Sequence, residues 1–173
     1  QAATPTSTGW RPTLEPQDDW MELPGRHRMV FDSISAGGLG QALVFANNVI
    51  EENKQAYGLD PSEQAIIMIV RHAATMFGYD DALWAKYGEA FTKRAELLDP
   101  KTKAAPVRNL YNAQGYGREL ANGGITLASL AAQGVHFAVC GRSTRGMIQG
   151  LVGQTKLKAE DLLEEFKAHL LPN

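Results

Sequence analysis

The feature that most constrains this chain is a run of six consecutive apolar residues at positions 65–70, Ala-Ile-Ile-Met-Ile-Val. Both alternating sets of positions are apolar and most of the residues are β-branched. This pattern is typical of a central parallel strand that helices cover on both faces. The run is also far shorter than the ~20 residues that cross a bilayer, so no membrane span is expected.

Two further short apolar runs, each ended by polar residues or glycine, are predicted to be strands. Apolar residues at three- and four-residue spacing predict helices between and after the strands. Because helices separate the strands, the fold class is predicted to be α/β, with a mainly parallel sheet and right-handed crossovers. The expected strands are 28–32, 65–70 and 134–140, and the expected helices are 39–58, 80–98, 125–133, 147–152 and 159–170.

The first 25 residues differ from the rest of the chain. Four prolines among Thr, Ser and Asp predict an extended N-terminal arm over 1–25, followed by one α/β domain over 26–173. Trp10 and Trp20 indicate that the arm lies against its own domain or a neighbouring subunit. The small, Thr- and Pro-containing start also suggests that a signal peptide was removed, and therefore a periplasmic or otherwise exported protein.

Two other regions bear on organisation and partners. Residues 99–117 show neither helical nor strand periodicity and are interpreted as a lid or a subunit contact. The chain ends where a further strand is expected, so either the fold is short or a C-terminal strand is missing. The chain has seventeen basic and nineteen acidic residues and no basic stretch that could neutralise several phosphates. Nucleic acid is therefore not an expected partner.

The ends of the predicted strands carry the candidate site. Parallel strands present their carboxyl ends at one edge of the sheet, where ligands bind. Asp32 ends the first strand, Arg71 and His72 end the second, and Cys140 ends the third. No other region of the sequence gathers as many titratable groups.

Cys140 is the sole cysteine and cannot form an internal disulfide. A thiol near a helix start and beside Arg142 and Arg145 is expected to have a lowered pKa and to act as a nucleophile. The alternative is an inert thiol buried in the core. His72 could deprotonate the thiol or bind metal with it, but His27 and His136 begin their strands at the opposite edge, so no metal site is expected.

The remaining candidates each have a structural alternative. Asp32 could orient His72 or cap the following helix, and capping is the favoured role. Gly37 and Gly38 open a predicted helix without the spacing of a dinucleotide-binding motif. They either hold a small anion or allow close packing, and no cofactor is predicted.

With these residues placed, the chain resembles the DsrE/DsrF-like sulfur-relay superfamily, in particular its exported members. The resemblance covers about residues 27–171 and rests on the first strand with its glycine-containing turn, on 65–72, and on 130–140, which ends in Cys140. It implies a three-layer α/β sandwich of flavodoxin-like topology that forms homo-oligomers or joins a larger complex.

The resemblance also implies a sulfur-handling protein in which Cys140 carries a persulfide. The residues themselves favour a small sulfur-containing anion as the ligand, and the candidates to bind it are Asp32, Gly37, Gly38, Arg71, Arg142 and Arg145. The alternative function is a non-catalytic ligand-binding or assembly subunit.

Overall fold

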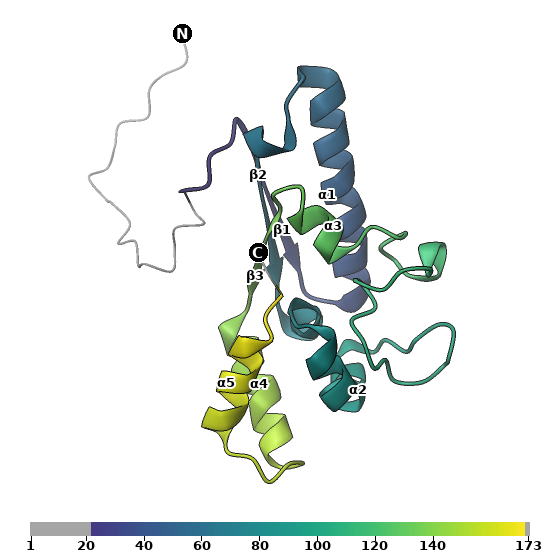
Figure 1. The fold of residues 1–173 in the computed structure, drawn as a ribbon, viewed down its shortest axis with the longest axis vertical. Coiled ribbons are helices and arrows are strands. Elements are labelled where there is room, and N and C mark those ends of the chain that lie inside the picture. The colour runs from purple at the N-terminus through teal and green to yellow at the C-terminus, as the bar shows by residue number, and fades with distance from the viewer. Residues whose placement is uncertain (1–21, 172–173) are drawn as a thin grey trace, which may run out of the picture.

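The computed structural model describes residues 22–171, so most of the predicted N-terminal arm, including Trp10 and Trp20, lies outside the described residues. Three parallel strands form one sheet in the order β1-β2-β3 (Figure 1). The strands are β1 (His27–Ser33), β2 (Gln64–Val70) and β3 (His136–Val139). The fold is therefore α/β with a parallel sheet, and the apolar run predicted to be the central strand lies at its centre.

The strand order corrects the predicted flavodoxin-like topology. In that topology the first strand lies between the second and the third, whereas here β1 is at an edge. The side chains explain why. Arg28 and Asp32 of β1 are exposed, and an edge strand tolerates charges that a central strand could not keep hydrated.

Helix α1 (Ala36–Tyr57) agrees closely with the predicted helix over 39–58. Ser35 caps its first turn by accepting a hydrogen bond from the Gly38 amide at 3.1 Å. Gly58 ends it in the left-handed region at φ 64°, which a residue without Cβ adopts without steric cost. Leu39 and Leu43 are fully buried and fix the helix against the sheet.

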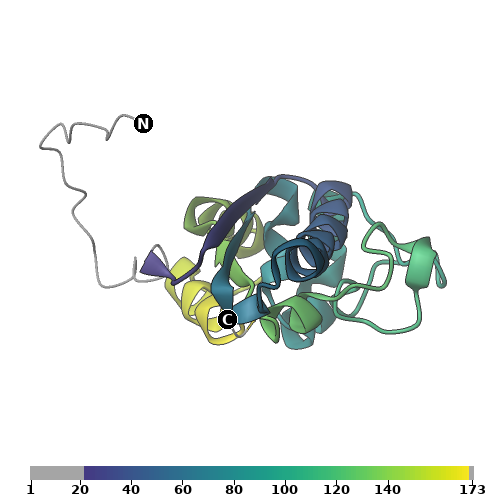
Figure 2. The ribbon, with the colours of Figure 1, turned by 90° about the horizontal axis from the view of Figure 1, so that it is seen from above.

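The two faces of the sheet differ in how they are covered. Met68 and Val70 point to the face covered by α1 and are fully buried, whereas Val30 on the other face is 59% exposed. Figures 1 and 2 show why: α4 (Gly141–Val152) and α5 (Ala159–Ala168) lie beyond the carboxyl ends of the strands. Within residues 22–171, the expected helical layers are therefore present on one face only.

Among the described residues, the remaining elements are one longer helix, α2, and four short ones. They are α2 (Asp81–Ala95), α3 (Leu127–Ala131), and the 3₁₀ helices η2 (Pro61–Glu63), η3 (His72–Gly78) and η4 (Gly117–Glu119). No described helix is long and apolar enough to cross a membrane.

Helix α2 runs unbroken through Gly88. The glycine allows a close approach of the chain at Pro106, because a Cβ there would stand 2.1 Å from the Pro106 carbonyl oxygen.

The segment 99–117 packs into its own domain. Leu110 and Tyr111 belong to this segment, which was interpreted as a lid or a subunit contact, but both are buried in the core. The Tyr111 ring stacks on Phe77 with centroids 4.6 Å apart, and its hydroxyl donates to the Ala36 carbonyl at 2.6 Å. The interpretation of these two residues as interface residues is therefore wrong. Their spacing has no period because they enter the core singly from a loop.

Candidate functional site

Cys140 lies at the junction between the sheet and helix α4. Its backbone N–H donates to the Val70 carbonyl at 3.0 Å, which extends the ladder between β3 and β2 by one residue. The helix begins at the next residue, so Cys140 is itself the N-cap, whereas the sequence suggested a start after Arg145. The cysteine is partly exposed, as a reacting thiol needs to be.

The surroundings of the sulfur favour its thiolate form. Hydrogen bonding from the Ser143 side chain lowers the pKa of the Cys140 thiol below its ordinary value, and the backbone amides of Ser143 and Arg142 lower it further. The positive charge of Arg71 acts in the same direction, while burial opposes them. This is the electropositive, partly exposed setting in which cysteines are reactive.

Ser143 belongs to the candidate site although it was not among the residues predicted from the sequence. Besides acting on the thiol, its hydroxyl oxygen accepts a hydrogen bond from the His72 backbone N–H at 3.1 Å. The side chain is buried, so its position is fixed. The spacing could have revealed it, because a side chain three residues after an N-cap reaches back to the cap.

Arg71 and Asp32 form a bidentate ion pair at the carboxyl edge of the sheet, where Cys140 also lies. Arg71 Nε and one terminal nitrogen donate to the two carboxylate oxygens of Asp32, both at 2.7 Å. These hydrogen bonds hold the pKa of Asp32 below its usual range. The expected capping role of Asp32 is wrong, because Ser35 caps α1. Asp32 instead orients the guanidinium whose charge acts on Cys140.

His72 contacts the candidate site through its backbone N–H, which donates to the Ser143 hydroxyl. It has φ 53°, an unusual conformation for a residue with a side chain, and this turn points its N–H toward Ser143. Across residues 22–171 the His72 ring makes no hydrogen bond to Cys140. The structure therefore brings His72 to the site, but no contact supports its predicted role as a base.

The other sequence candidates fall into two groups. Arg142 and Arg145 are exposed on the first turns of α4, and Arg142 acts on the thiol through its amide. Gly37 and Gly38 lie in the first turn of α1, where Ser35 already accepts from the Gly38 amide. That contact favours a structural role for Gly38 over the holding of an anion.

A hydrogen-bond chain connects Cys140 to the interior. Thr144 donates from its hydroxyl to the Cys140 carbonyl at 3.1 Å, and its oxygen lies 2.6 Å from the Tyr79 hydroxyl. Burial raises the pKa of Tyr79 to about 12. Tyr79 therefore stays neutral near pH 7 and stabilises the position of the first turn of α4.

The described residues contain no group of three His, Cys, Asp or Glu side chains that could hold a metal ion. Comparisons of the chain with protein-family models, curated proteins and solved structures find no match in any of the three.

Proposed function

We propose that this chain is a sulfur-handling protein in which Cys140 accepts a sulfur atom and carries it as a persulfide. One observation supports this most strongly: Ser143, two backbone amides and the Arg71 charge all lower the pKa of a partly exposed thiol. A thiolate is the nucleophile in sulfur exchange. The resemblance to the DsrE/DsrF-like superfamily, whose members place a sulfur-accepting cysteine at this strand end, favours the same role.

The reaction needs no external oxidant or reductant. The Cys140 thiolate attacks the outer sulfur of a thiosulfate-type anion and forms a new S–S bond. The bond between the two donor sulfurs breaks, and its electron pair leaves with sulfite. An acceptor thiolate can then attack the outer sulfur of the Cys140 persulfide, which returns the Cys140 thiolate.

Each neighbouring residue has a role in this proposal. Ser143 and the amides stabilise the thiolate and the persulfide anion, and Arg71, oriented by Asp32, attracts the anionic donor. Arg142 contributes through its backbone amide, which lowers the pKa of the thiol. His72 positions Ser143 through its backbone. An exported, periplasmic location belongs to the same proposal.

The test is to incubate the full chain with thiosulfate and measure its intact mass. We expect a gain of one sulfur atom that reducing agent reverses and that Cys140→Ser abolishes. Ser143→Ala should load several-fold more slowly, because it removes the largest contribution to the lowered thiol pKa. Ser62→Ala, an exposed serine on η2, is the matched control and should load normally.

Absence of loading from thiosulfate and from a small-molecule persulfide would contradict the proposal. Equal loading of Ser143→Ala and the wild type would show that the geometry of the site does not activate the thiol.

A second candidate function, assembly of copies of this chain, is favoured by the exposed face of the sheet. Alternate residues of a strand share a face, so Arg28, Val30 and Asp32 of β1 lie along it in the order cation, apolar, anion. A two-fold axis near Val30 would place Arg28 of one copy opposite Asp32 of the other. Exposed apolar area on a parallel sheet also favours cover by a partner.

Light scattering on the full chain tests assembly. We expect a dimer for the wild type and a monomer for Val30→Lys, because a buried lysine would lose its hydration. Phe45→Lys is the matched control: Phe45 is 54% exposed on α1, and this variant should stay dimeric. A monomeric wild type, or equal dimerisation of both variants, would contradict this use of the face.

A further inference from the structure

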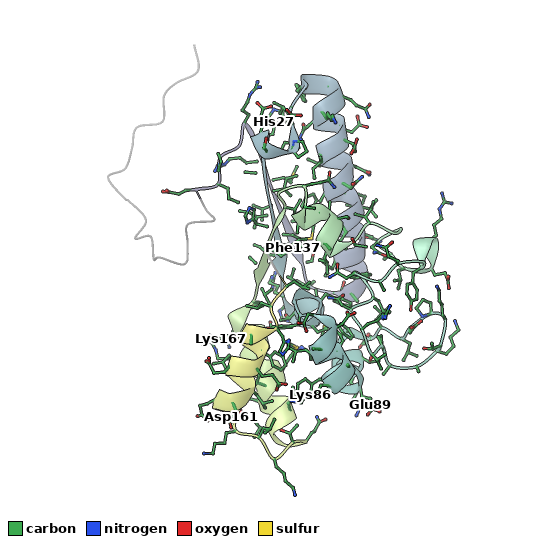
Figure 3. All side chains as sticks on the ribbon, viewed as in Figure 1. His27, Lys86, Glu89, Phe137, Asp161 and Lys167 are labelled. Carbon is green, nitrogen blue, oxygen red and sulfur yellow. The ribbon has the colours of Figure 1, made fainter. Side chains whose placement is uncertain are left out.

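A cavity of about 330 Å³ lies between β3, α4 and α5, next to the Cys140 junction but with Cys140 outside its lining. Figure 3 labels Phe137 on β3 and Lys167 on α5, which belong to two of its walls. Phe166 and Tyr79 also line it, and they are only 0% and 2% exposed. This volume is at the small end of the range for ligand pockets, roughly 300–1,000 Å³.

The interior of the cavity offers almost entirely apolar contacts. Its walls are mostly aromatic and aliphatic side chains, and its two hydroxyls, Tyr79 and Thr144, already hydrogen-bond to each other at 2.6 Å. A sugar or a nucleotide would leave many polar groups without partners there, which is costly. The interior therefore fits a hydrocarbon or aromatic body.

The rim of the cavity carries positive charge. Arg145 lines it and makes no hydrogen bond or ion pair with any residue in 22–171, and its guanidinium lies 4.0 Å from where a Cβ on Gly141 would stand. Lys167 also lines it but is paired with Glu164 at 2.9 Å. Arg145 is thus the cation with donors available to a ligand.

We infer that this cavity binds a small amphipathic anion, a monocarboxylate with an unbranched or aromatic hydrocarbon body. The hydrocarbon fills the space between Phe137, Phe166 and Leu163, and the carboxylate accepts hydrogen bonds from the Arg145 guanidinium. This site goes beyond the proposed sulfur chemistry and needs no thiol.

Titration calorimetry of the full chain with octanoate, and with octan-1-ol as the uncharged match, tests the inference. We expect octanoate to bind more tightly than octan-1-ol. Arg145→Gln should weaken octanoate binding about tenfold and leave octan-1-ol binding unchanged, because only the charged head loses its partner. Arg94→Gln, which removes an exposed cation from α2, should change neither affinity.

Two further variants locate the ligand. Leu163→Trp should fill the cavity and abolish binding of both probes, whereas Cys140→Ser should bind octanoate like the wild type. Amide NMR shifts should move at Gly78, Thr144 and Leu163. The inference fails if octanoate does not bind, if octan-1-ol binds equally well, or if Arg145→Gln or Leu163→Trp binds octanoate as the wild type does.

Discussion

Replacing Asn109 by alanine is expected to lower the free energy of unfolding by about 3 kcal/mol. The Asn109 side chain is 1% exposed and donates to the carbonyls of Phe77 and Tyr79 at 2.8 and 2.9 Å. Its carbonyl oxygen also accepts from the Tyr111 backbone N–H at 3.2 Å. Alanine would leave these buried backbone groups without partners, and each such group costs about 1–3 kcal/mol, with partial relaxation reducing the sum.

Urea unfolding followed by circular dichroism measures this loss. Asn48→Ala, an exposed asparagine on α1, is the matched control and should change the free energy of unfolding by less than about 0.5 kcal/mol. Asn109→Asp keeps the acceptor but loses both donors, so it should be destabilised like Asn109→Ala. If Asn109→Ala unfolds at the wild-type urea concentration, segment 99–117 does not hold η3 in place.

The elements of the fold could be predicted where one local pattern determines the structure. The run at 65–70 has both faces apolar, which only a central strand satisfies, and α1 has one apolar face and a glycine stop at Gly58. The coverage of the second sheet face could not be predicted this way. It depends on the direction in which α4 leaves Cys140, and helical periodicity carries no information on that direction.

Segment 99–117 was beyond prediction for a different reason. Asn109 and Tyr111 are held by hydrogen bonds and ring stacking to residues about 30 positions away, Phe77 and Tyr79. These contacts are tertiary and leave no repeat in the sequence. The absence of a period favoured a lid or a subunit contact, whereas the loop folds back and inserts these side chains into the core.

The expectation that ligands bind where parallel strands end indicated this candidate site, but it did not indicate the role of each residue there. Asp32 pairs with Arg71 and the Arg71 charge acts on Cys140, because parallel strands end at one edge of the sheet. The neighbours of Cys140 in sequence, Arg142 and Arg145, were expected to supply charge, but Arg71 of the adjacent strand does so. Ser143 was missed because its effect depends on α4 starting directly at Gly141.

The Cys140 thiol is expected to react with iodoacetamide at a lower pH in the native protein than in the unfolded chain. Alkylation requires the thiolate, and the Ser143 side chain, two amides and Arg71 lower the pKa of Cys140 in the folded state. The rate plotted against pH should therefore rise to its half-maximum below the pH found in urea. Ser143→Ala should move that midpoint upward and slow alkylation near neutral pH several-fold.

The same lowered pKa links the thiol to stability. Between the folded and unfolded pKa values of Cys140, the native state binds fewer protons than the unfolded state, so stability rises with pH in that window. This contribution is fully present above the unfolded pKa and is lost as pH falls through the folded pKa. Cys140→Ser should remove this part of the pH dependence, whereas Ser62→Ala should preserve it.

A native thiol that resists alkylation at every pH, while the unfolded chain reacts normally, would show that Cys140 is inaccessible and would remove the basis for its role as a sulfur carrier.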